Sequence, residues 1–299
     1  MRRYTITQFK NEYPNDDACL DKIFQLRFKN IVCKCGADKQ FVRVKNRRSY
    51  QCPCCGFQIY PTKDTVFEKT TTPLTYWFHA IYLQTTTRNG VAAKELERQL
   101  NVCYKTALRM AHQIKKLMTR RDNNPFYGIV EIDETYLGSK LGNLKNKKRK
   151  EVDKIPFRDN MYGKTIIFGI LQRGGAVYTQ VIPAATKEIV EKIIKKRVIA
   201  PSKINTDNAQ IYNHLGHDYI HDTVNHKQRE WVWEESHVQN IESYWNQLKR
   251  TIKGTHIHVS LKHIQKYMDE VSFRWEHRDR QDEMMEIILS RVVYGSRHF

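Results

Sequence analysis

Apolar residues between positions 73 and 120 recur at the spacing of amphipathic helices. Pro73 stands where a first-turn proline would, and Trp77, Ile81 and Tyr82 follow at helical spacing. The segments VAAKELERQL and YKTALRMAHQIKKLM come next, separated by the short break NVC. Two amphipathic helices joined by a tight turn are the local form of a helix-turn-helix, which we predict within residues 73–122.

After Pro125 the pattern changes to short runs rich in Ile, Val, Phe and Tyr, which are typical of strands. The sequence Arg-Gly-Gly at 173–175 indicates a hairpin between two of these runs. The predicted strands are 128–133, 165–172, 176–182 and 202–206, and the predicted helices are 186–198 and 238–252. We therefore expect an α/β domain over residues 126–280. An N-terminal helical segment is expected within residues 1–30, and 281–299 is expected to be a tail.

The net charge of the chain indicates which class of binding partner to expect. The 299 residues include 51 Lys and Arg against 32 Asp and Glu, a net charge of +19. Such an excess predicts a polyanionic partner, with nucleic acid first and an anionic membrane surface second. No run approaches the ~18 apolar residues that span a bilayer, and the N-terminus lacks the apolar core of a secretory signal. We expect a cytoplasmic protein that does not enter membranes.

Five of the seven cysteines lie between positions 33 and 55, which favours a metal site over a disulfide framework. Cys33 and Cys35, then Cys52 and Cys55, form two short knuckles on either side of a basic, strand-like stretch. Four thiolates in this arrangement suit tetrahedral Zn²⁺, so residues 31–66 are predicted to be a zinc ribbon. Cys54 is an alternative to Cys55 as the fourth ligand.

Basic and aromatic residues mark candidate DNA contacts. Tyr104, Lys105 and Arg109 lie early on the second helix of the pair, where side chains enter the major groove in a helix-turn-helix. An ordinary helical hairpin with a solvated basic face is the alternative. The stretch 139–158 carries eight basic and two acidic residues and is expected to be a basic loop. Further phosphate contacts are expected from Arg47, Arg48, Lys147, Lys148 and Arg149.

Three acids interrupt this basic chain in the stretch VEIDETYL, residues 130–137. Asp133 ends one predicted strand and Asp207 follows another, while Glu242 lies on a predicted helix with Lys249 two turns beyond it on the same face. Two strand-end aspartates and a helical glutamate suit a pair of Mg²⁺ ions that act on a phosphodiester. Glu131 and Glu134 are expected to face solvent or to play a supporting role.

Long motifs give the chain a resemblance to a known family. They begin with CGFQIYPTKDTVFEKTTTPLTYWF and GVAAKELERQLNVCYKTALRMAHQIKKLM, and continue with VEIDETYLGSK, INTDNAQIY and NIESYWNQLKRTIKGTHIHVSLKHIQKYMDEVSFRW. In order and content these resemble a transposase of the IS1595 insertion-sequence family, the group with the ISXO2-like transposase domain. The resemblance covers most of residues 30–280. The knuckle Cys33–Cys35 departs from it by being shortened, and the stretch 208–210 lacks the usual aromatic residue.

The resemblance implies an RNase H-like catalytic core with a DDE triad, a zinc ribbon and a helix-turn-helix. It matches Asp133, Asp207 and Glu242 to the triad and Lys249 to the basic residue that follows it. It also implies two Mg²⁺ or Mn²⁺ ions per site, binding of double-stranded terminal inverted repeats and target DNA, and assembly of at least a dimer on DNA. Some relatives carry asparagine as the third catalytic residue, which leaves Asn240 as an alternative to Glu242.

Two other functions compete with transposition. One is a domesticated regulator that binds DNA without catalysis, which the intact acids at 133, 207 and 242 disfavour. The other is a metal-dependent nuclease that cuts but does not join, which the sequence does not separate from a transposase.

Overall fold

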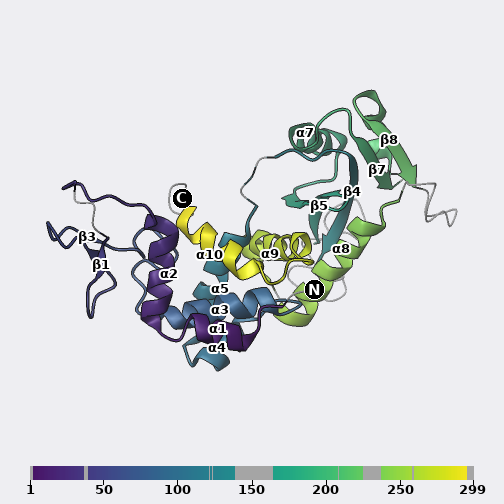
Figure 1. Ribbon diagram of the computed structural model, residues 1–299. Coiled ribbons are helices and arrows are strands. Elements are labelled where there is room, and N and C mark those ends of the chain that lie inside the picture. Colours follow the sequence, from purple (N-terminus) through teal and green to yellow (C-terminus); the bar gives the residue numbers. More distant parts are fainter. Residues whose placement is uncertain are drawn as a thin grey trace. The chain divides into compact units, whose positions relative to one another are not determined.

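The computed structural model divides the chain into two compact units, residues 1–118 with 277–299 and residues 119–276 (Figure 1). Each unit is described by itself. The structure describes residues 3–36, 40–120, 122, 124–138, 164–207, 209–224, 237–257 and 259–294. The basic stretch 139–158, with Lys147, Lys148 and Arg149, lies outside these ranges.

The first unit is largely helical. Its helices are α1 (Ile6–Glu12), α2 (Asp16–Phe28), α3 (Leu74–Thr86), α4 (Ala93–Leu100), α5 (Tyr104–Met118) and α10 (Met284–Tyr294). Asn101 adopts a left-handed conformation at φ +49°, which ends α4 and allows the tight turn into α5. The buried faces of α3, α4 and α5 carry large apolar side chains, including Trp77, Leu96 and Met110.

Two features of this unit depart from the sequence prediction. The segment 281–299 was expected to be a tail, but α10 buries Met284, Ile288 and Leu289 and packs against α2, α3 and α5. Helix α1 arises in a region without apolar periodicity because Thr5 and Gln8 form a reciprocal capping box at its N-terminus.

The second unit contains a five-stranded sheet. Its strands are β4 (Ile129–Leu137), β5 (Thr165–Gln172), β6 (Val177–Ile182), β7 (Lys203–Asp207) and β8 (Ile220–Val224), in the spatial order β6-β5-β4-β7-β8. The pairs β6–β5 and β5–β4 are antiparallel, whereas β4–β7 and β7–β8 are parallel. Strand β4 is therefore central, with one antiparallel and one parallel neighbour.

Helices cover both faces of this sheet. Helix α7 (Lys187–Arg197) and two 3₁₀ turns (Gln210–Tyr212 and Leu215–His217) share a core with even-numbered residues of β4, such as Ile132. Helices α8 (Gln239–Arg250) and α9 (Ile264–Glu276) form a second core on the opposite face. Because side chains alternate along a strand, the odd-numbered residues of β4 face α8.

The position of β4 differs from the prediction in one respect that matters for the site. The strand was expected to end at Asp133, but its ladder with β5 continues to Leu137 paired with Thr165. Its ladder with β7 covers only Ile129 to Glu131. Asp133 and Glu134 thus lie inside β4, where the strand is paired with β5 but no longer paired with β7.

No helix within the described ranges combines the length and the apolar character needed to cross a membrane.

Candidate catalytic and metal sites

Asp133 lies in the middle of the central strand and faces α8. The indole Nε1 of Trp245, on α8, donates a hydrogen bond to Asp133 Oδ2 over 2.9 Å. Gly169 of β5 is paired directly with Asp133 and leaves the space that the indole fills. A Cβ atom at Gly169 would lie 2.5 Å from two ring carbons of Trp245. The missing side chain on β5 thus allows α8 to reach the aspartate.

Asp207 ends β7 beside Asp133. Glu131 pairs with Asn205, so the residues two positions further along the two parallel strands lie at the same level. The backbone N–H of Ala209 donates to Asp207 Oδ1 over 3.2 Å, which turns the chain as the strand ends. The charge of Asp207 acts on both Asp133 and Glu134, so the two aspartates, far apart in sequence, lie near each other. Their joint role as cation ligands stays a prediction.

Glu134 completes a cluster of three carboxylates. It points to the opposite face from Asp133, where Tyr212 of the first 3₁₀ turn donates to its Oε2 over 2.5 Å. Burial raises the pKa of Asp133 to about 7, and the neighbouring charges of Glu134 and Asp207 add to this increase. Burial and the charge of Asp207 also raise the pKa of Glu134, against the hydrogen bond from Tyr212.

Glu134 thus corrects one expectation from the sequence. It was placed past the end of the strand as a surface or supporting acid, but it lies within β4 and shares the negative charge of the cluster. Burial is the main cause of both raised pKa values, and the neighbouring acids add to it. Carboxylate oxygens are the donors that a hard divalent cation prefers. The donor type therefore fits Mg²⁺ or Mn²⁺. The ligand atoms of the three acids are not gathered within 4.8 Å of one another, so a divalent-cation site at these residues stays a prediction.

Glu131 is also not at the surface: it is 0% exposed. Arg173 Nε donates to its Oε1 over 2.9 Å, and the backbone N–H groups of Asn240 and Ile241 donate to its Oε2 over 3.0 Å each. The side-chain amide of Asn240 donates to Oε1 over 2.8 Å. Because Val238 offers no side-chain cap, Glu131 caps the N-terminus of α8 from the neighbouring strand. The solvent-facing alternative is therefore wrong for Glu131, and these bonds give it a structural role at the start of α8.

Glu242 lies on the first turn of α8, three residues before Trp245, and is half-buried. Among the described residues, ligand atoms of three or more His, Cys, Asp or Glu residues lie within 4.8 Å of one another only at the cysteines. Convergence of Glu242 on Asp133 and Asp207 therefore stays a prediction. Asn240, its alternative, directs its side chain to Glu131.

Four cysteine sulfurs in the first unit lie within 4.8 Å of one another: Cys33, Cys35, Cys52 and Cys55. The Sγ atoms of Cys33 and Cys55 are 3.4 Å apart and those of Cys35 and Cys52 are 3.8 Å apart. Tetrahedral coordination with Zn–S bonds of about 2.3 Å requires sulfurs roughly 3.8 Å apart, so the group fits Zn²⁺. Cys54 is outside the cluster.

The backbone around the cysteines explains why they meet. Strands β1 (Val42–Arg43), β2 (Tyr50–Gln51) and β3 (Gln58–Ile59) form a small antiparallel sheet beside the two knuckles. Gly36 and Gly56 both have φ +74°, and each donates its N–H to the first cysteine carbonyl of its knuckle. The backbone amides of Cys55 and Cys54 point to the sulfur of Cys52 and lower the pKa of its thiol to about 6.

The predicted DNA contacts of the first unit differ in their surroundings. Tyr104 is exposed at the start of α5, and Lys105 and Arg47 are exposed as well. The guanidinium of Arg109 lies 5.6 Å from the ring centroid of Trp77, and Arg48 bonds Thr70 O, Thr72 O and Asp16. The contacts of Arg48 favour a role within the fold, whereas Tyr104, Lys105 and Arg47 stay predictions for DNA contact.

Residues 125–276, just over half of the chain, match the family described as the ISXO2-like transposase domain. The chain belongs to this family. A protein of the transposable element ISH50 of Halobacterium salinarum is 26% identical over 288 residues, which cover 90% of this chain and 94% of that protein. A transposase-like protein of Haemophilus influenzae is 25% identical over 121 residues, which cover 40% of this chain and 95% of its own.

Among solved structures, the Mos1 strand transfer complex is 12% identical and covers 74% of this chain and 78% of its own. Its TM-score of 0.29 is too low to establish a common fold. Family membership of this ISXO2-like transposase therefore rests on its sequence.

Three residues around the candidate site were not found by sequence reasoning: Trp245, Gly169 and Tyr212. Trp245 had a partial signal, because it follows Ile241 by four residues, an apolar spacing typical of one helix face, but its bond to Asp133 was not expected. Gly169 also had a signal, since an isolated glycine inside a strand often marks the close approach of another group. Tyr212 carried none, because its distance from Glu134 depends on how β7 and the 3₁₀ turn pack.

Proposed function

We propose that this protein is an insertion-sequence transposase that binds terminal inverted repeats and catalyses metal-dependent cleavage and strand transfer of DNA. The observation that carries the proposal is the carboxylate cluster of Asp133, Glu134 and Asp207 inside the family-matched region. Burial raises the pKa of Asp133 to about 7, and the charges of Glu134 and Asp207 add to the increase. A divalent cation would neutralise that charge.

The residues have separable roles in this proposal. Asp133 and Asp207 hold the cations from adjacent strands, and Glu242 approaches from α8. When bound, two divalent ions lower the pKa of the attacking water or 3′-hydroxyl and stabilise the leaving oxygen of an in-line displacement. Trp245 orients the Asp133 carboxylate through its indole N–H, and Glu131 fixes the start of the helix that carries both Trp245 and Glu242.

The sheet supports an RNase H-like core for this domain. Such cores have three antiparallel strands followed by two parallel ones, with the first strand in the centre. The order β6-β5-β4-β7-β8, with α7 between β6 and β7 and α8 after β8, has that arrangement. The two candidate aspartates then lie on the first and fourth strands in chain order.

The first unit is proposed to bind the terminal repeats. Helices α4 and α5, joined by the tight turn at Asn101, serve as the helix-turn-helix, and the net charge of +19 favours contact with phosphates. The four-cysteine cluster is proposed to hold a structural Zn²⁺. Joining two ends of one element requires two catalytic centres, so we propose at least a dimer on DNA.

Cleavage and joining by the purified protein test the catalytic proposal. A labelled duplex of the element's end is incubated with Mg²⁺, and cut and joined products are separated. Asp133→Asn is expected to lower both rates by about 10³-fold or more, because one charged ligand of the cations is lost. Lys192→Ala, on the opposite face of the sheet, is the control. Full activity of Asp133→Asn would exclude the assignment.

The same assay separates the rival functions. Cleavage without joined product would favour a nuclease. Binding of the duplex without cleavage in Mg²⁺ or Mn²⁺ would favour a regulator.

The zinc proposal has a matched pair of variants. Cys52→Ser is expected to lose bound zinc, because Cys52 is one of the four clustered sulfurs. Cys54→Ser is expected to retain it, because Cys54 lies outside the cluster although it is only two residues away. Zinc content of the purified proteins is measured by atomic spectrometry, and full zinc content in Cys52→Ser would overturn the ligand set.

A further inference from the structure

One exposed face of α8 continues beyond the carboxylate site as a row of polar and basic residues. Glu242, Asn246, Lys249 and Lys253 are spaced by four, three and four residues, which places them on one side of the helix. The adjacent side of the helix, about 100° away, packs Ile241, Trp245 and Leu248 into the core. The row therefore starts at a proposed cation ligand and leads away from it along the surface.

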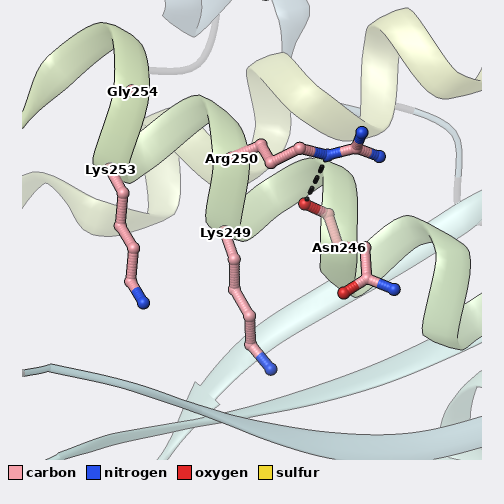
Figure 2. A pocket seen from close by; sticks show the side chains of 5 residues that line it. All are labelled: Asn246, Lys249, Arg250, Lys253 and Gly254. Carbon is pink, nitrogen blue, oxygen red and sulfur yellow. Dashed lines mark hydrogen bonds between the residues drawn. The ribbon is translucent and has the colours of Figure 1, made fainter.

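The far end of this row lines a cavity of about 660 Å³, and among the described residues its lining includes no acid: Asn246, Lys249, Arg250, Lys253 and Gly254. Figure 2 shows the side chains of Lys249 and Lys253 extending in the same direction, side by side. Arg250 extends to another side, and its Nε donates to the carbonyl oxygen of Asn246 over 3.2 Å. Two ammonium groups thus share one open hollow.

The backbone changes at the same place. Residues Thr251–His256 form a turn of π-helix, an uncommon form that is frequent at functional sites. Thr251 and Ile252 are buried, while Lys253 and Gly254 are exposed. A Cβ atom at Gly254 would meet nothing within 4 Å, so the backbone borders open space. This turn keeps Lys253 on the cavity side and leaves room for a ligand beside the main chain.

We propose that Asn246, Lys249, Lys253 and the backbone at Gly254 form a track that binds successive backbone phosphates of the DNA strand entering the carboxylate site. The inference rests on the proposed function and deepens it, because it gives the strand a direction along α8. Lysines are point charges suited to phosphate oxygens, and Asn246 adds an amide donor. A row of cations fits a polyanionic strand better than a single small anion, which one lysine would satisfy.

The salt dependence of DNA binding tests the track without catalysis. The whole protein is titrated with a duplex of the element's end, in the absence of divalent metal, at several salt concentrations. Each phosphate contact contributes about 0.9 to the slope of log K against log salt for duplex DNA. Lys253→Ala is expected to reduce this slope by about that amount, whereas Lys253→Arg retains it. Lys192→Ala, an exposed lysine on α7, removes the same charge and is expected to leave the slope unchanged.

Two further measurements remove ambiguity. Duplexes that each carry one uncharged methylphosphonate linkage locate the contact. At the position that Lys253 contacts, the modified linkage is expected to lower the affinity of the wild-type protein. The same linkage is expected to leave the affinity of Lys253→Ala unchanged relative to the unmodified duplex. Gly254→Glu places a negative charge in open space and is expected to weaken binding, whereas Gly254→Ala is tolerated. Circular dichroism confirms that each variant is folded.

The outcomes distinguish this inference from the proposed function. If Lys253→Ala and Lys192→Ala change the slope equally, and no methylphosphonate position couples to Lys253, the track is wrong even if the protein cuts DNA. If Asp133→Asn still cuts while Lys253→Ala lowers the slope, the catalytic assignment fails and the track stands. A wild-type protein that does not bind the duplex would overturn both.

Discussion

Glu131 and Asp133 lie two residues apart on β4 and face the same helix, but their surroundings are opposite in charge. Around Glu131 are one guanidinium and three amide donors, at Arg173, Asn240 and Ile241. Around Asp133 are the indole N–H of Trp245, the backbone N–H of Glu134 and the charges of two further carboxylates.

This difference in surroundings indicates a structural role for Glu131 and a ligand role for Asp133, although both lie on β4. A buried carboxylate surrounded by donors is stable as an ion and holds structure, so Glu131 fixes α8 to the sheet. A buried carboxylate beside other acids is costly as an ion unless a cation joins it. Asp133 therefore has the surroundings of a ligand, and its position depends on the helix that Glu131 holds.

The largest expected effect on stability is that of replacing Glu131. Glu131→Gln keeps the shape of the side chain but leaves the half-buried guanidinium of Arg173 beside a neutral amide in place of its fully buried carboxylate. We therefore expect a loss of about 3–5 kcal/mol in the free energy of unfolding. Urea unfolding measures it. The control is Glu191→Gln, in an exposed pair with Lys195 on α7, which should cost below about 1 kcal/mol. Equal small losses in both variants would mean that Glu131 does not anchor α8.

The next effect concerns pH at the carboxylate cluster. The folded pKa of Asp133, about 7, lies above its unfolded value, so the folded state binds more protons between about pH 4 and 7. The stability of the metal-free protein should therefore fall as pH rises through this window and level off above it, by a few kcal/mol. Asp133→Asn should flatten this part of the profile.

Unfolding measured between pH 5 and 8 checks this prediction, by comparing wild type with Asp133→Asn so that other titrating groups cancel. Adding Mg²⁺ at pH 8 should restore stability to the wild type more than to the variant, because a ligand that binds the folded state stabilises it. Identical pH profiles for the two proteins would contradict the raised pKa.

A smaller effect is expected where the helix passes over the sheet. Gly169→Ala places a methyl group 2.5 Å from the indole of Trp245, so the ring must move away from Asp133. We expect a cost of about 1–3 kcal/mol in unfolding free energy, together with slower cleavage. Gly254→Ala, which meets nothing within 4 Å, is the matched control for stability. A Gly169→Ala protein as stable and active as wild type would mean that α8 adjusts freely.

Local sequence patterns predicted the parts of the molecule whose partners are close in the chain. The spacing of Cys33, Cys35, Cys52 and Cys55 was sufficient to predict that these residues meet, because two knuckles and a hairpin bring them together within 23 positions. The choice between Cys54 and Cys55 was left open, since it depends on the turn at Gly56 and not on spacing. The strands β5, β6 and β7 were predicted within one residue at each end.

Features that depend on packing between distant segments could not be predicted in the same way. Glu131 looked like a surface acid because its donors at 240 and 241 are more than a hundred positions away. Whether an odd-numbered residue of β4 faces water or a helix depends on which element covers that face. The length of β4 was missed for the same reason, since its second half is defined by pairing with β5.

The smallest expected effect concerns the hydrogen bond from Trp245 to Asp133. This bond connects Asp133 to α8, the helix whose start Glu131 caps. Trp245→Phe removes the indole N–H but keeps a ring over Gly169. Because that bond lowers the pKa of Asp133, its loss should raise the pKa further, by about one unit for a bond worth ~1.5 kcal/mol to a charged group. The acidic limb of the pH–rate profile for cleavage should then move to higher pH by a similar amount.

Trp275→Phe, on α9, is the control for loss of an indole elsewhere in the same core, and it should leave the acidic limb in place. The position of the limb separates this effect from simple destabilisation, which lowers the rate at every pH without moving the midpoint. If Trp245→Phe lowers the rate but leaves the limb at the wild-type pH, then the indole only fills space above Gly169. Asp133 would then be oriented by the strand alone, and Glu131 would support the site through α8 without reaching its chemistry.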